Sequence, residues 1–212
     1  MNRFDQLIKQ FWWQVTQHCE AIRMLGMNQI PLNNNLLENI QKHLVDIDPY
    51  LTFHFARNEQ SDYVDLVFGC DGYTNRIDLV LDIVNAAPKL QGLRAVAFNA
   101  RAVQIPELID MGEFWVALDD PFFQLRQQGQ TLHLDIYLED LHAFNQDPRM
   151  EGVMMLLDAI LGEYDLMTRI ASINWLDLPA DPLDHNLLQL SHLRTVFDNQ
   201  RHHIRTIGIA VH

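Results

Sequence analysis

The sequence predicts an α+β protein: a mainly antiparallel, mixed sheet with one strand-helix-strand unit, helices packed on it and an N-terminal helical pair. Apolar residues recur at helical spacing before residue 48 and alternate with polar residues from residue 51 onward. Between Asp65 and Arg101, an apolar strand, an Asp-Gly turn, an amphipathic helix and a second apolar strand follow one another. A chain of 212 residues can bury a substantial core around these elements.

The first two predicted elements are amphipathic helices. Residues 2–25 place an apolar stripe along one face of a long helix, which Gly26 ends. After a loop that contains Pro31, a second helix repeats this spacing at Leu37, Ile40, Leu44 and Ile47. About ten residues join the two helices, so the simplest arrangement is an antiparallel pair. We therefore expect residues 1–48 to form a helical extension packed on the core.

The next elements form a hairpin and then a strand-helix-strand unit. Residues 51–56 and 63–68 alternate apolar and polar side chains across a polar connection, which predicts two antiparallel strands. After the Asp71-Gly72 turn, Asn75 is predicted to cap a helix, because its side chain can accept hydrogen bonds from the first exposed amides. Proline and glycine residues then end the helix and lead into the next strand, at Pro88 and Gly92.

The second half of the predicted core, which spans residues 49–200, adds strands and two helices. Strands are expected near residues 114–118 and 132–138, with a further one at 122–126. A buried helix over 152–161 and a strand over 172–178 follow. Asp181 is predicted to cap a last helix that begins at Pro182. Residues 201–212 form a basic C-terminal tail, with two arginines, three histidines and no acidic residue.

The charge of the chain restricts its partners. A formal net charge of −13 repels phosphate backbones and anionic lipids, so we expect neither a nucleic acid nor a membrane surface as a partner. A protein with a basic surface fits this charge.

The cysteines and the N-terminus indicate the compartment. Two cysteines, Cys19 and Cys70, cannot build a disulfide framework, and the N-terminus lacks the apolar core of a signal peptide. The cytoplasm is the expected location.

The sequence contains none of the common motifs for catalysis or metal binding. No serine lies in a Gly-x-Ser-x-Gly turn, and His18 and Cys19 are adjacent on a helix, where they point about 100° apart. The sequence has no Cys-x-x-Cys pair and no His-Glu-x-x-His motif. Acidic clusters near residues 139–142 and 181–185 are better explained by capping of helix starts. We therefore predict no catalytic residue, no metal and no cofactor.

One candidate binding face remains, on the strands. If the alternation is right, one face of the sheet is aliphatic and the other carries polar and aromatic side chains suited to stacking and hydrogen bonding. A histidine-carboxylate pair there could also support acid-base chemistry. The alternative is an ordinary solvated face, or one partly covered by the N-terminal helix pair. The residues predicted to line this face are His54, Tyr63, Asp65, Trp115, His133, Asp135 and Tyr137.

Two blocks of the sequence resemble a bacterial family of uncharacterised domains. The first, AAPKLQGLRAVAFNAR, is similar to the family's Ala-Pro-x-Leu-x-Gly turn and the strand that follows it. The second, LLDAILGEYDLMTRIASINWLDL, is similar to its Leu-Asp-x-x-Leu-Gly-Glu-Tyr-Asp block. Leu93 departs from the family, in which a tryptophan follows the glycine. The resemblance covers roughly residues 50–180 and implies an α+β fold without assigning a reaction.

These observations favour a soluble, cytoplasmic, acidic protein-interaction or regulatory module without catalysis. The alternative is a small-molecule-binding domain or a hydrolase that uses the His/Asp/Tyr sheet face. A concave pocket around His133 would favour the alternative, because ligand sites in proteins are concave.

Overall fold

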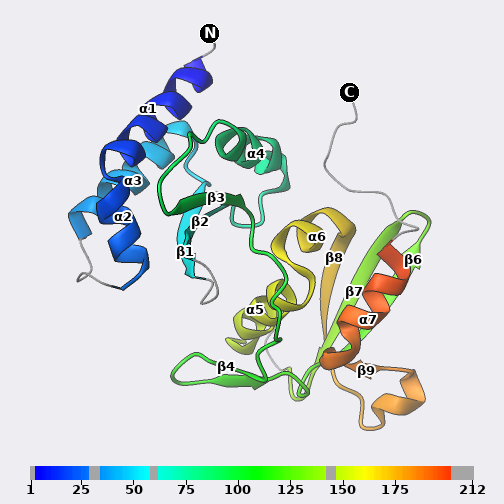
Figure 1. Ribbon diagram of the computed structural model, residues 1–212. Helices are drawn as coiled ribbons and strands as arrows, with labels where there is room; N and C mark the ends of the chain where they lie inside the picture. The colour runs from blue at the N-terminus through cyan, green and yellow to red at the C-terminus, as the bar shows by residue number, and fades with distance from the viewer. Residues whose placement is uncertain (1–2, 29–33, 58–61, 142–146, 202–212) are drawn as a thin grey trace. The chain divides into compact units, whose positions relative to one another are not determined.

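A computed structural model describes residues 3–28, 34–57, 62–141 and 147–201 (Figure 1). It confirms the α+β class, with helices and three separate sheets in the described part of the chain. Contacts between Cα atoms divide the chain into a first unit, residues 1–99, and a second unit, residues 100–212. This division differs from the expected boundary after residue 48, because the N-terminal helices share a core with the strands that follow them. Of the predicted basic tail, only Arg201 lies within the described residues.

The N-terminal helices of the first unit are α1 (Arg3–Gln17), α2 (Cys19–Gly26) and α3 (Asn34–Ile47). The predicted long helix is therefore interrupted at His18, whose φ of −112° and ψ of 14° leave the helical region. The N–H of His18 lies 3.3 Å from the carbonyl oxygens of both Gln14 and Val15, so the helical hydrogen bond is shared at this point. The chain changes direction there without a glycine or proline.

The first sheet contains β1 (Thr52–Arg57), β2 (Val64–Gly69) and β3 (Leu93–Ala97) in that order. β1 pairs with β2 antiparallel and β2 pairs with β3 parallel, which confirms the predicted hairpin and strand-helix-strand unit. Trp12 of α1 packs edge-on against Phe68 of β2, with ring centroids 5.6 Å apart. Its Nε1–H also donates to the carbonyl oxygen of Ile83 at 2.8 Å. Helices α1 and α4 therefore cover the same face of this sheet (Figure 1).

The connecting helix α4 spans Ile77–Asn85 and begins differently from the prediction. Asn75 lies inside a 3-10 turn, Thr74–Arg76, and the residue at the helix N-cap is Arg76, which makes no side-chain capping bond. The prediction of an Asn75 cap is therefore wrong, because the 3-10 turn already satisfies the first amides. Ile77, Val80 and Ile83 are buried against the sheet.

The strands of the second unit form two sheets. β4 (Leu108–Asp110) and β5 (Trp115–Ala117) make an antiparallel pair. The four-stranded sheet has the order β8-β7-β6-β9. Its strands are β6 (Phe122–Gln128), β7 (Thr131–Leu138), β8 (Ile170–Asp177) and β9 (Leu188–Gln189).

A second strand-helix-strand crossover, which the sequence did not predict, lies in this unit. β7 and β8 are parallel, and α5 (Arg149–Leu161) and α6 (Glu163–Arg169) connect them. The predicted aliphatic side of β7 packs against α5 and α7 (Leu193–Gln200), as Figure 1 also shows. Its members, at most 2% exposed, are Leu132, Leu134, Ile136 and Leu138.

The last helix begins later than predicted. Pro182–His185 form only a 3-10 turn, and Asp181 makes no side-chain capping bond. Asn186 follows with a positive φ of 55°, which ends the turn. Helix α7 starts at Leu193, where a buried leucine anchors it to the core. Among the described residues, no helix combines the length and the apolarity needed to cross a membrane.

Candidate functional site

The structure distributes the seven predicted site residues over three sheets. The alternation of side chains along a strand determines which face of the strand each one occupies, but not which other strands pair with it. The prediction of a single continuous face is therefore wrong. His54 and Asp65 belong to the first sheet, with Tyr63 just before β2, and Trp115 belongs to β5. The other three lie on β7 of the four-stranded sheet: His133, Asp135 and Tyr137.

On the first sheet, His54 and Asp65 share a face as expected. His54 lies opposite Val67 and Ala56 lies opposite Asp65, so the histidine and the acid are diagonal neighbours. Asp65 is engaged by Arg94 on β3, whose Nε and one terminal nitrogen each lie 2.7 Å from a carboxylate oxygen. This contact raises the pKa of Arg94. The acid therefore serves a cross-strand ion pair rather than His54.

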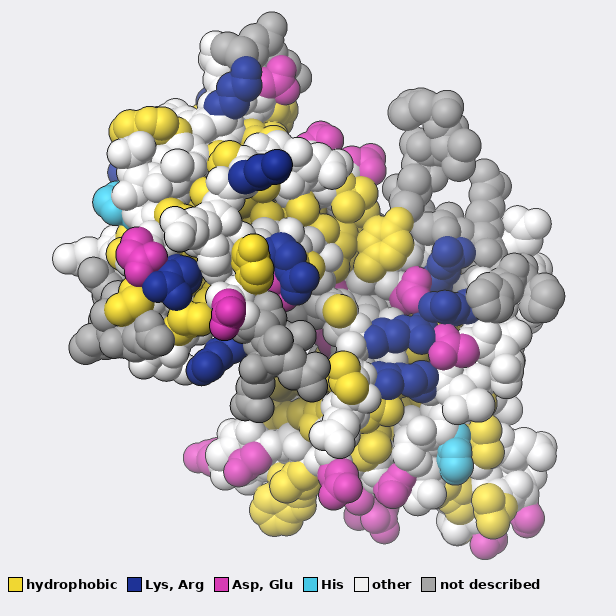
Figure 2. Space-filling view, viewed as in Figure 1, with side chains coloured by type: hydrophobic (Ala, Val, Ile, Leu, Met, Phe, Trp, Pro, Cys, Tyr) yellow, Lys and Arg dark blue, Asp and Glu magenta, His cyan; other side chains and the backbone are white. Residues whose placement is uncertain are grey.

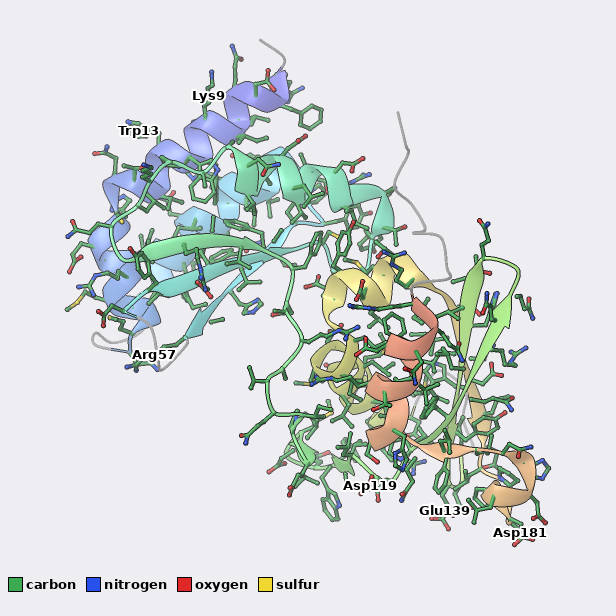
Figure 3. The ribbon with its side chains drawn as sticks, turned by 45° about the vertical axis from the view of Figure 1, so that its right-hand side comes forward. Lys9, Trp13, Arg57, Asp119, Glu139 and Asp181 are labelled. Carbon is green, nitrogen blue, oxygen red and sulfur yellow. The ribbon has the colours of Figure 1, made fainter. Side chains whose placement is uncertain are left out.

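Trp115 borders a groove of about 370 Å³ in the second unit. Its side chain is 66% exposed, and acidic residues line the groove beside it. Figure 3 shows two of them, Asp119 and Glu139, at the same end of this unit. Arg149 also lines the groove, but its guanidinium is held by Asp147 and by the carbonyl oxygen of Glu139 at 3.0 Å. The groove thus combines two aromatic side chains, Trp115 and Phe122, with carboxylates and one arginine.

On the four-stranded sheet, Asp135 is the centre of a hydrogen-bonded cluster. Its side chain accepts from Arg126 of β6 at 2.5 and 2.8 Å and from Asn174 of β8 at 2.7 Å. Burial raises the pKa of Asp135, but the hydrogen bonds and charge of Arg126, together with the bond from Asn174, outweigh it and lower the pKa. The carboxylate therefore stays ionised and fixed, which suits a structural ion pair better than proton transfer.

His133 is held by hydroxyl groups instead of by Asp135. Its Nδ1 lies 2.9 Å from Ser172 Oγ, and its Nε2 lies 3.2 Å from Thr131 Oγ1. The predicted histidine-carboxylate pair therefore does not form a hydrogen bond. Tyr137 lies on the same face, and burial, followed by the charge of Asp135, raises its pKa. In the described residues, no group of three or more His, Cys, Asp or Glu side chains is arranged to hold a metal ion.

Sequence reasoning missed a groove of about 850 Å³ in the first unit. It runs between α1 and α4, and we call it the acidic groove. Its apolar floor is formed by Phe4, Ile8 and Leu79. Four carboxylates and two cationic side chains line it: Asp5, Asp48, Asp78, Asp82, Lys9 and Arg76. Figure 3 shows Lys9 on α1.

A signal for this groove is present in the sequence. Asp78 and Asp82 are four residues apart on a helix, where two like charges repel each other and weaken the helix. An acidic residue in the first turn of a helix interacts favourably with the helix dipole, which accounts for Asp78. Asp82 lies one turn further along the helix, where this interaction is lost. Both side chains are exposed, whereas a third acid, Asp48, forms an ion pair with Arg76 at 2.6 Å. The spacing of the two exposed acids therefore does not stabilise the helix, and it is the feature of the sequence that marks this face of α4.

Comparison with protein-family models, curated proteins and solved structures found no match. The resemblance to the bacterial family of uncharacterised domains therefore stays a prediction, and the function of this chain has to be inferred from its own geometry.

Proposed function

We propose that this protein is a non-catalytic, acidic interaction module of the cytoplasm that binds a basic, amphipathic segment of a partner protein in the acidic groove. The observation that carries the proposal is the composition of the groove, in which four carboxylates and two cations surround an apolar floor. Charge complementarity speeds association and selects against acidic partners. The apolar floor gives such a partner a surface to bury.

The dimensions of the acidic groove agree with this role. Its volume of about 850 Å³ lies toward the upper end of the roughly 300–1,000 Å³ that pockets for small molecules span, which leaves room for several side chains of a partner segment. Phe4 is 47% exposed, which is costly for a phenylalanine in water unless a partner covers it. An amphipathic helix presents an apolar stripe bordered by charged side chains, and it therefore matches an apolar floor bordered by carboxylates.

The polar sheet faces support a role without catalysis. Asp65 and Asp135 are both occupied by arginines, and both ring nitrogens of His133 contact hydroxyl oxygens. A general base needs an accessible lone pair near the substrate, and the lowered pKa of Asp135 makes its carboxylate a weak base. These contacts weigh against the hydrolase alternative at Asp135 and His133.

The test is binding of a fluorescent peptide composed of lysine and leucine at helical spacing, measured by anisotropy. We expect the double variant Asp78→Asn/Asp82→Asn to bind the peptide about fivefold more weakly, because exposed ion pairs contribute roughly 0.5 kcal/mol each. The matched control is Asp181→Asn/Asp184→Asn, which removes the same charge from exposed positions in the second unit. Equal weakening in both variants would show general charge attraction and would contradict a site at the acidic groove.

A further inference from the structure

Four arginines gather in the second unit although this unit is strongly acidic. Residues 100–212 contain 17 Asp and Glu against 7 Lys and Arg, a formal charge of −10. Figure 2 shows Arg side chains (dark blue) close together in this unit, which contains no lysine, with acidic side chains among them. We call the four the arginine cluster: Arg101, Arg169, Arg194 and Arg201.

Two carboxylates hold three of these arginines. Asp165 lies 3.2 Å from a terminal nitrogen of Arg101, 3.2 Å from one of Arg201 and 3.8 Å from Nε of Arg169. Asp198 lies 2.6 Å from Arg101 and 3.5 Å from Arg201. Three positive charges therefore converge on two negative ones.

The fourth arginine, Arg194, donates its hydrogen bonds to neutral groups. They run to the main-chain oxygens of Ile160, Ala102 and Ala159 at 3.0, 2.9 and 2.8 Å. Two of these carbonyls lie at the C-terminal end of α5, whose dipole offsets only part of a unit charge. The four arginines of the cluster and the two carboxylates, Asp165 and Asp198, together carry four positive and two negative formal charges.

The arginine cluster is accessible to solvent along one side of α7. Arg194, Asp198 and Arg201 are spaced four and three residues apart, which places them on one helix face. The side chain of Arg201 is 37% exposed and that of Asp198 is 40% exposed. An anion from solution can therefore approach the cluster. The half-buried surroundings strengthen its attraction to the guanidinium groups.

We infer that the arginine cluster binds the phosphate group of a small anionic ligand. Guanidinium groups match phosphate oxygens with paired, charge-assisted hydrogen bonds, and convergent arginines are the usual way to hold such a group. The acidic remainder of the unit repels a long polyanion, which favours a small ligand over a nucleic acid. This inference concerns the second unit and does not depend on the acidic groove.

The experiment is isothermal titration calorimetry of the full chain with inorganic phosphate and pyrophosphate at constant ionic strength. We expect millimolar or tighter binding, with pyrophosphate the tighter of the two because it offers more charge and more oxygens. Arg201→Gln should weaken binding about fivefold or more, since it removes one charge-assisted contact at the end of α7. Asp198→Asn should strengthen binding, because it removes a competing carboxylate.

The matched control is Arg94→Gln, which removes one partly exposed arginine, paired with a single carboxylate, from the first unit. It should leave the affinity for pyrophosphate unchanged. The inference is overturned if pyrophosphate produces no binding heat, or if Arg201→Gln and Arg94→Gln bind it equally, which indicates an adventitious ion only. Equal affinity for citrate would overturn the assignment to phosphate. Circular dichroism of each variant verifies that a loss of binding is not a loss of folding.

Discussion

Arg126 on β6 reaches diagonally across the four-stranded sheet to Asp135 on β7. In the strand register Arg126 lies opposite His133, and Gln124 is the residue opposite Asp135. The guanidinium nevertheless forms two hydrogen bonds with the carboxylate, at 2.5 and 2.8 Å, while Asn174 donates from the other side. A polar side chain that is only 4% exposed is thus supplied with donors from both neighbouring strands.

The first prediction concerns this ion pair. Arg126→Leu leaves the buried carboxylate of Asp135 with Asn174 as its remaining donor, and we expect a clear loss in the free energy of unfolding. Urea unfolding followed by circular dichroism measures it. The control is Arg94→Leu, which breaks the analogous cross-strand pair with the more exposed Asp65 and should cost less than about 1 kcal/mol. Equal losses would show that burial of the acid does not decide the cost.

The second prediction concerns pH. Burial, followed by repulsion from Glu163, raises the pKa of Asp158 to about 6. Because the folded state prefers the protonated form, the carboxyl costs nothing at acidic pH and destabilises the fold as pH rises through 6. Asp158→Asn should therefore stabilise the protein at pH 8, by about 1 kcal/mol after solvent screening is allowed for, and have little effect near pH 4. Thermal melts at the two pH values test this, and an equal gain at both would contradict it.

The third prediction concerns Gly92. Its φ is +70°, and a Cβ at this position would lie 2.4 Å from Cδ of Arg23. Gly92→Ala should cost about 1–2 kcal/mol, through backbone strain and displacement of the arginine side chain. Gly72→Ala is the matched control, because Gly72 has a φ of +77° and a Cβ there would meet no atom within 4 Å. If the two variants melt at the same temperature, the contact with Arg23 adds nothing to the strain.

The fourth prediction concerns the docking of α1 on the first sheet. Phe11 is fully buried, and its ring packs edge-on against Phe68 at a centroid distance of 5.7 Å. Phe11→Ala should lower the free energy of unfolding by about 3–5 kcal/mol, because it leaves a cavity in the core. Trp13→Ala removes an exposed aromatic ring from the same helix and should cost far less. A small loss in Phe11→Ala would mean that α1 is not needed for the stability of the sheet.

Local patterns in the sequence determined most elements of this protein. The alternation of Leu132, Leu134 and Ile136 with His133 and Asp135 predicted both faces of β7, because successive side chains of a strand point to opposite sides. The apolar strands around residues 64–69 and 93–97, with a helix between them, predicted a strand-helix-strand unit, and in the structure its two strands are parallel. Such features depend on neighbours in the chain, so a single sequence contains the information.

Capping was less predictable, because it depends on backbone geometry that several residues set together. Asn75 and Asp181 have side chains suited to an N-cap, but both lie at 3-10 turns and make no capping bond. The α-helices begin later, at Ile77 and Leu193, where apolar residues meet the core. Tertiary packing overrode the local signal in both cases.

Only the tertiary structure decided which residues meet. The alternation pattern placed His54, Asp65, His133 and Asp135 on polar faces, but it does not specify which strands pair, and the structure divides these residues between two sheets. It also brings together Arg101, Asp165 and Arg201, which lie on separate elements and have no common motif in the sequence. Strand pairing and helix packing join residues far apart in the chain. The free energy of these contacts depends on how well complete surfaces fit together, and a short segment of sequence contains no information about that fit.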